Sequence, residues 1–233
     1  MGLFNLLGVP FAWILSMLYK LIGNYGITLI VFTVLTSAAM LPLFASQMKN
    51  TGKMAALQPK MAEIQSRYAD DKETQNRKLQ ELYAKENYKP TAGCAPMVIQ
   101  LIIVFALFAV LRNPLSFKAV ANEAFMMATH EKFGWMNDLS QPDPWVMPIL
   151  AAITQFMVTK ATNSAQPGNG QNTMNKMMLY FFPLMLLWLG RSMPAGLCMY
   201  WVVRSLISFV QTVVLNKKRA HEMLRAEVEK EFR

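Results

Sequence analysis

The residue whose chemistry fits its surroundings least is Arg204, near the middle of the apolar stretch 194–216. That stretch is long enough to cross a membrane, which takes roughly 20 mostly apolar residues. An arginine at such a depth costs about 2.5–3.5 kcal/mol on insertion scales, so it usually faces protein or a water-filled cavity. A lone buried cation is neither a nucleophile nor a base. It therefore indicates binding of polar, especially acidic, groups rather than catalysis.

A helix over 194–216 would carry a stripe of polar side chains on the same face as Arg204. The stripe follows helical spacing and leads to the lysines at 217 and 218; its members are Trp201, Arg204, Ser208, Gln211 and Thr212. One face of this helix is therefore predicted to be hydrated, with its opening toward the basic end. Two alternatives stay open. Arg204 could instead extend to the interface or pair with a carbonyl group, and Trp201 could face lipid or the core.

The composition is that of a membrane protein. Hydrophobic residues make up 54% of the chain and charged residues 16%, against a usual charged share of about 25%. The apolar residues come in long blocks. We therefore predict an all-α polytopic membrane protein with five transmembrane helices, over 27–45, 95–111, 145–159, 174–190 and 195–216.

The segments outside these spans have distinct characters. Residues 1–23 are apolar but contain Pro10, Trp13 and Tyr19, which fits a helix at the extracytoplasmic interface better than an extra span. Residues 24–216 form the predicted core, with an outer loop at 112–144 and a flexible cytoplasmic loop at 160–173. The basic tail 217–233 is predicted to continue the last span as a helix.

Residues 47–91 differ sharply from the spans around them. They contain nine basic and six acidic residues, with apolar residues at helical spacing on either side of Asp70 and Asp71. This pattern predicts a helical hairpin of two amphipathic helices outside the membrane. By itself, a charged hairpin is more often a solvated surface than a binding site.

The orientation follows from the distribution of lysine and arginine. One side of the membrane collects seventeen of them, in the hairpin, the 160–176 segment and the tail, and the other side collects five. The positive-inside rule puts the first group in the cytoplasm. With five spans, the N-terminus is then outside and the C-terminus is cytoplasmic.

The residues needed for catalysis are missing from the predicted spans. Both histidines, His130 and His221, lie outside them, and no span contains an acidic residue. The sequence has no phosphate-binding glycine loop. We expect no enzyme activity, cofactor or metal site. Instead we expect a polar groove, lined by Arg204, Ser37, Thr33, Gln100, Gln155, Thr159, Trp201, Ser208 and Gln211.

Several separated motifs carry a family resemblance over about residues 24–215. They are Asn24-Tyr25-Gly26, Leu41-Pro42-Leu43, Leu57-Gln58-Pro59-Lys60, Ala92-Gly93-Cys94-Ala95-Pro96, Asp138-Leu139 with Asp143-Pro144, Phe182-Pro183, and Pro194-Ala195-Gly196-Leu197 with Tyr200-Trp201. In this order and spacing, the chain resembles the YidC/Oxa1/Alb3 family of membrane-protein insertases.

The resemblance implies a bacterial cell-membrane protein that inserts small one- or two-span clients through a hydrophilic groove, alone or beside the Sec translocon. It also implies that the cytoplasmic hairpin receives clients and contacts targeting factors. The hairpin residues we expect to take part are Gln58, Pro59, Lys60, Arg67 and Tyr83. Contact of the tail with the ribosome is weakly indicated, because the tail is also acidic.

One position departs from the family pattern. The family usually carries a groove arginine on the first span, and the matching position here is Ser37. Our hypothesis is that the groove charge has moved to Arg204. Two other functions stay open: a scaffold that holds partner helices without inserting them, and a channel or transporter.

Overall fold

The structure is a computed structural model that describes residues 3–88, 95–117, 123–164 and 173–231. These residues form helices and two isolated bridges, Phe133 with Met136 and Pro142 with Pro194, and contain no β-strand. The α-helices, in chain order, are α1 (Leu3–Ile22), α2 (Tyr25–Ala39), α3 (Leu41–Arg67), α4 (Lys72–Lys85), α5 (Ala95–Arg112), α6 (Glu123–Ala128), α7 (Val146–Ser164), α8 (Thr173–Gly190) and α9 (Ala195–Glu231); a 3-10 helix, η2, covers Pro114–Phe117.

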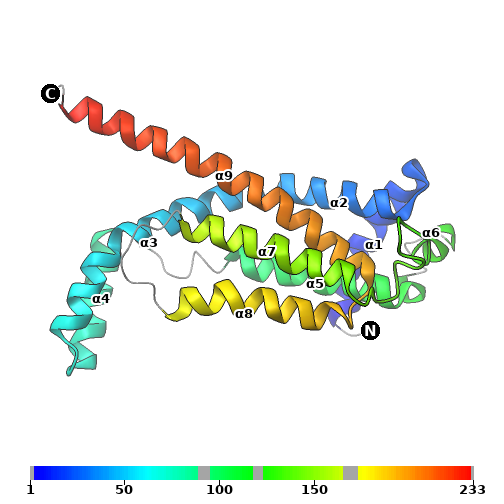
Figure 1. The fold of residues 1–233 in the computed structure, drawn as a ribbon, viewed down its shortest axis with the longest axis horizontal. Helices are drawn as coiled ribbons and strands as arrows, with labels where there is room; N and C mark the ends of the chain where they lie inside the picture. Colours follow the sequence, from blue (N-terminus) through cyan, green and yellow to red (C-terminus); the bar gives the residue numbers. More distant parts are fainter. Residues whose placement is uncertain (1–2, 89–94, 118–122, 165–172, 232–233) are drawn as a thin grey trace.

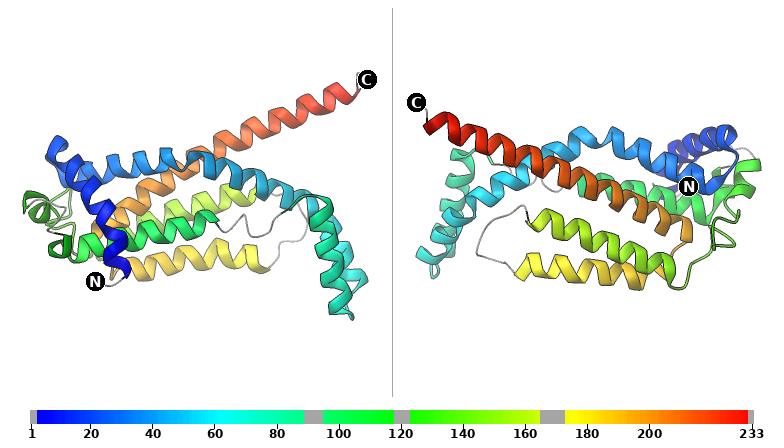
Figure 2. Two further views of the ribbon diagram at one scale, coloured as in Figure 1. Left: turned by 180° about the vertical axis from the view of Figure 1, so that it is seen from behind. Right: turned by 45° about the horizontal axis from the view of Figure 1, so that its top comes forward.

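The long helices α2, α5, α7, α8 and α9 run side by side along one direction (Figure 1). The α3–α4 hairpin projects from one end of this bundle, and α6 lies at the opposite end. The last part of α9 extends beyond the bundle (Figure 2). Helix α1 crosses the bundle near the end where α6 lies. We call the end that carries the α3–α4 hairpin the hairpin end, and the end that carries α6 the loop end.

The helix over the first predicted span, 27–45, is not continuous. Its helix is divided at Met40, and Tyr25–Ala39 and Leu41–Met54 meet at an angle of 56°. Pro42 follows directly after the break. A proline has no N–H to donate and fits the first turn of a helix, so it favours a new helix starting here. The hairpin therefore begins at Leu41 rather than at residue 47.

Two other boundaries differ from the prediction. The helix predicted over 145–159 continues as α7 to Ser164, into the expected loop 160–173, whose residues 165–172 lie outside the described part of the chain. The last span and the tail form one continuous helix, α9, as the sequence predicted. Residues 89–91 of the predicted hairpin also lie outside the described ranges.

Length and hydropathy identify few complete spans in the described ranges. Ala195–Lys218 of α9 passes this test alone, and the bent pair Tyr25–Ala39 and Leu41–Met54 passes it together. Shorter apolar stretches occur at Gly8–Ile22, Val98–Arg112 and Leu179–Gly190. The number of spans, five, therefore stays a prediction.

The apolar core lies toward the loop end, where α1, α2, α5 and α9 meet the outer loop. Its largest fully buried side chains include Tyr25, Phe32, Leu111, Phe125 and Tyr200. The outer loop joins this end through backbone bonds: the N–H groups of residues 195 and 196 donate to the carbonyl groups of residues 141 and 139. The start of α9 is thus held against the loop.

Glu131 and Asp143 of the outer loop accept hydrogen bonds from backbone N–H groups at the starts of two bundle helices. Glu131 accepts hydrogen bonds from the Tyr19 hydroxyl of α1 and from the backbone N–H of Tyr25, the first residue of α2. Asp143 accepts from the backbone N–H groups of residues 145, 146 and 147, at the start of α7. Helix N-termini leave such donors unpaired, and a carboxylate there also interacts favourably with the helix dipole.

Candidate functional site

The buried side chains of the bundle change from apolar to polar between its two ends. On α2, the last buried apolar residue is Phe32, and the buried residues after it are Thr33 and Ser37. On α9, Tyr200 is the last buried apolar residue in the part whose side chains are described, and Ser205 and Thr212 are the buried ones beyond it. On these two helices, the buried side chains toward the hairpin end are therefore polar, whereas α3 also buries the apolar residues Met48 and Leu57.

The turn of the helix places Arg204 between two neighbouring helices. At about 100° per residue, Arg204 and Gln211 share one face of α9. On one side of this face, Ser205 contacts α7. On the other, Gly196 lies against α2, where an added Cβ would approach Leu29 to 3.2 Å. Arg204 and Gln211 thus lie on the face of α9 between its contacts with α2 and with α7.

Of the five buried side-chain atoms that lack a hydrogen-bond partner among the described residues, three belong to predicted groove residues. They are Arg204 Nη1, Gln211 Oε1 and Ser37 Oγ. Leaving such an atom unpaired costs about 1–3 kcal/mol, so a polar partner from outside the described chain is expected at each of them. Water and a polar segment of another protein both fit that requirement.

Arg204 is also linked to α5 through Tyr200, one turn earlier on α9. Gln100 Nε2 donates to the Tyr200 hydroxyl at 3.0 Å, so the α9 turn that precedes Arg204 is bonded to α5. Gln100 and Arg204 were both predicted site residues, but Tyr200 was not among them. Its position one turn before Arg204 was the signal that could have found it.

A second polar cluster joins α7 to α9 through Gln155. Its Oε1 accepts from Trp201 Nε1 and Ser205 Oγ, both at 3.3 Å, and its Nε2 donates to Thr159 Oγ1 at 3.3 Å. The structure thus brings the predicted residues Gln155, Thr159 and Trp201 together. Ser205 was not predicted, although it follows Arg204 directly in the sequence.

Two predicted residues, Thr33 and Ser208, form hydrogen bonds within their own helices. Thr33 is fully buried, and its hydroxyl donates to the Leu29 carbonyl of its own helix at 2.6 Å. Ser208 is half-buried, and its carbonyl accepts from the Thr212 hydroxyl at 2.8 Å. Because the hydroxyl of Thr33 is already paired, it is a weaker candidate for contact with a bound segment than Ser37.

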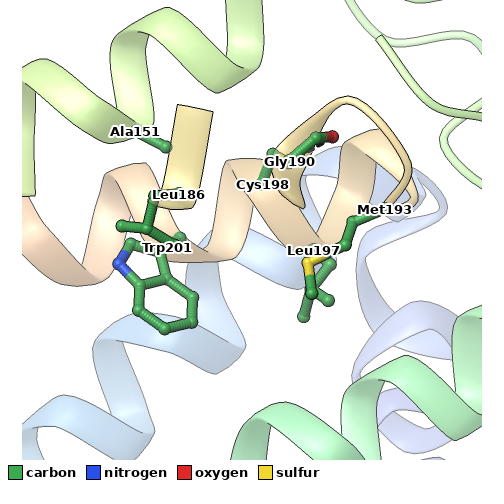
Figure 3. Close-up of a pocket in the computed structure, with 7 residues that line it drawn as sticks. All are labelled: Ala151, Leu186, Gly190, Met193, Leu197, Cys198 and Trp201. Atoms are coloured by element: carbon green, nitrogen blue, oxygen red, sulfur yellow. Dashed lines mark hydrogen bonds between the residues drawn. The ribbon is translucent and has the colours of Figure 1, made fainter. Parts of the chain in front are cut away.

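The space beside Trp201 is too small to be the site. It has a volume of about 10 Å³ and is lined by α7, α8, the α8–α9 turn and α9. Figure 3 shows Trp201 beside Leu186, with Ala151 and Cys198 farther along the same space. A volume of this size holds about one water molecule. The ring centres of Phe182 and Trp201 lie 6.1 Å apart, so these two side chains pack α8 against α9.

Two of the five predicted hairpin residues, Lys60 and Tyr83, connect the two helices of the hairpin. Lys60 Nζ lies 2.6 Å from Glu86 Oε1, and the Tyr83 hydroxyl donates to Met61 Sδ at 3.9 Å. Arg67 is exposed, 4.0 Å from Glu63. Gln58 and Pro59 lie within α3. Lys60 lowers the pKa of the exposed Glu86 carboxyl through a hydrogen bond and its charge.

Comparison with known proteins adds a family to this geometry. The family model described as "60Kd inner membrane protein" matches residues 17–222. The chain belongs to this family. It is 36% identical to a membrane protein insertase YidC of Fusobacterium nucleatum over 94% of this chain and 98% of that protein.

Other relatives are much longer. The chain is 34% identical to a membrane protein insertase YidC of Cupriavidus taiwanensis over 93% of this chain but only 36% of that protein. A solved structure described as an active YidC insertase with the first transmembrane domain resolved is similar, with a TM-score of 0.64 and 22% identity over 91% of this chain and 47% of that one. This likeness confirms the all-helical fold.

Proposed function

We propose that this chain is a membrane protein insertase that moves short hydrophilic segments of small client proteins through a polar groove and releases their helices into the bilayer. One observation carries the proposal: along α2 and α9 the buried side chains change from apolar to polar toward the hairpin end, and Arg204 Nη1, Gln211 Oε1 and Ser37 Oγ are buried there without a partner among the described residues. Its relatives named membrane protein insertase support the same function.

The physical gain of such a groove is a smaller desolvation cost. A polar group moved into hydrocarbon loses its hydrogen bonds to water, at a cost of several kcal/mol. Groove water and the three unpaired polar atoms would replace part of those bonds. The guanidinium of Arg204 would favour acidic client segments over basic ones. No nucleotide or cofactor is needed for this mechanism.

The orientation and partners belong to the same proposal. The hairpin and the tail, which carry most of the lysines and arginines, lie in the cytoplasm of a bacterial cell, and the N-terminus lies outside. The groove then opens toward newly made clients. The hairpin receives them, and the Sec translocon, targeting factors and the ribosome are further proposed partners.

The proposed site centres on Arg204, with Ser37 at the position where the family usually carries an arginine. The charge is provided by α9 instead of α2. The contact between Gly196 of α9 and Leu29 of α2 supports this exchange, because it shows that these two helices pack together. Their starts, Tyr25 and Ala195, both adjoin the outer loop.

The test is insertion of a two-span client with an acidic translocated segment into liposomes that contain the purified full chain. We expect Arg204→Ala to lower the insertion rate about tenfold, equivalent to ~1.4 kcal/mol. Adding Ser37→Arg to this variant should restore most of the rate. The matched control is Arg191→Ala, because Arg191 stacks 4.1 Å from the centre of the Trp145 ring and is not among the proposed groove residues.

The outcomes separate the candidate functions. Full activity of Arg204→Ala would reject the moved charge and leave groove hydration as the mechanism. A wild-type protein that inserts nothing would favour a scaffold. Ion flux through the same liposomes without insertion would favour a channel.

A further inference from the structure

A second cavity lies outside the polar groove, between α5 and the α8–α9 turn. Its volume is about 580 Å³, within the range of about 300–1,000 Å³ that is usual for ligand sites. The lining residues are Val104, Phe105, Phe108, Ala109, Arg112, Asn113, Met193 and Leu197. None of the predicted groove residues is among them.

The cavity has two chemically different parts. The last turns of α5 and the two residues from the α8–α9 turn and α9 provide apolar walls. Arg112 and Asn113 follow these walls at the end of α5, where both side chains are exposed. The Arg112 guanidinium lies 5.5 Å from the centre of the Phe108 ring. A cation is thus held beside an apolar space at the loop end of the bundle.

Arg112 is free to bind an external anion. Among the side chains that the structure describes, no carboxylate forms an ion pair with it. Its recorded contact is the face of Phe108, which leaves the N–H groups at the edge of the guanidinium available. Arginine binds phosphate oxygens well through this edge, often with two parallel hydrogen bonds.

We propose that this cavity binds an anionic phospholipid from the surrounding membrane, with an acyl chain along α5 and the phosphate at Arg112 and Asn113. The occupant is chosen by charge and shape together. An apolar cavity of this volume in a membrane protein would fill with hydrocarbon rather than remain empty, because protein interiors leave few large voids. Arg112 at its end, which has no carboxylate partner among the described residues, then favours a lipid with a negative headgroup.

The experiment measures lipid binding to the purified full chain by native mass spectrometry after delipidation. The probes are phosphatidylglycerol and phosphatidylcholine with identical acyl chains. We expect phosphatidylglycerol to bind about fivefold more tightly, as one basic residue near a membrane surface provides. Arg112→Gln should remove this preference. Ala109→Phe, which fills the cavity, should weaken binding of both lipids.

The matched control is Arg191→Gln. Arg191 is also an arginine, but it lies in the α8–α9 turn and does not line the cavity. This variant should leave the preference unchanged. Equal binding of the two lipids to the wild type would overturn the proposal, as would an equal effect of Arg191→Gln and Arg112→Gln.

A second measurement tests the main competing occupant, a client helix. A photo-reactive residue at Phe105, which lines the cavity, is activated in liposomes with and without client. We expect lipid adducts in both samples. Adducts with client polypeptide alone would overturn the proposal.

Discussion

Trp201 on α9 and Gln155 on α7 are joined by a hydrogen bond, in which the indole Nε1 donates to the amide Oε1 over 3.3 Å. Ser205 donates to the same oxygen. The two donors lie one turn apart on α9, so one glutamine fixes both the spacing and the rotation of α9 relative to α7. Since Arg204 adjoins Ser205, this contact also determines where Arg204 points.

Replacing Gln155 tests this contact. Gln155→Leu keeps a similar volume but leaves the Trp201 and Ser205 donors without an acceptor. We expect a loss of about 1 kcal/mol in unfolding free energy, because two interhelical hydrogen bonds are lost and each contributes on average ~0.6 kcal/mol between membrane helices. Thermal unfolding in detergent measures it. Thr162→Val is the control, because Thr162 donates only within its own helix, to Val158; equal losses in both variants would contradict the assignment.

Close packing at the loop end leaves no room for a side chain at Gly26. A Cβ at this position would lie 2.1 Å from the Phe133 ring, closer than atoms can approach. Gly26→Ala should therefore destabilise the protein by about 1–3 kcal/mol, as overpacking does. Phe133→Ala in the same chain should recover part of the loss. At Gly190, the nearest atom to an added Cβ is 3.2 Å away, so Gly190→Ala should cost less.

The carboxylate of Asp143 should make stability depend on pH. Burial by itself raises its pKa, but the hydrogen bonds from Trp135 and from backbone N–H groups at residues 145–147 outweigh it, and the pKa lies below the ordinary 3.8. A carboxyl group whose pKa is lower in the folded state stabilises the folded protein at pH values above its pKa in the unfolded state. This contribution is present at neutral pH and is lost as pH falls through the folded pKa.

The pH effect has a direct measurement. We expect Asp143→Asn to lower the unfolding temperature at neutral pH by an amount that shrinks as the pH falls through the depressed folded pKa, where the wild type also loses the charge. Asp143→Ala also removes the helix cap and should cost about 1 kcal/mol. A difference between wild type and Asp143→Asn that stays constant with pH would contradict the role of the charge.

The hairpin ion pair separates a structural role of Lys60 from direct contact with clients. Lys60→Glu should loosen α3 from α4, because it places two carboxylates at the position of the present 2.6 Å contact. The charge-exchanged double variant, Lys60→Glu with Glu86→Lys, should restore both hairpin order and insertion. Hydrogen exchange in residues 57–86 and the liposome assay measure the two effects. Restored order without restored insertion would instead indicate that Lys60 contacts clients itself.

The sequence by itself determined the class of the fold and the faces of the helices. Long apolar blocks predicted the bundle, and helical spacing placed Arg204 and Gln211 on one face of α9, because that spacing is a local property of the chain. The end of the first span is predicted at Ala45 because the residues up to there are uncharged and mostly apolar, although Pro42 is a local signal for the break at Met40. The direction of α3 relative to α2 shows where the first helix ends.

The structure, and not the spacing along each helix, shows which polar side chains are already paired. Thr33 and Ser37 look equivalent in the sequence, yet the hydroxyl of Thr33 is paired within α2 and that of Ser37 is not. Trp201 and Arg204 share a predicted stripe, yet Trp201 binds Gln155 while Arg204 Nη1 is buried without a partner. Spacing along a helix fixes the direction of a side chain, whereas its partner depends on which other helix packs there.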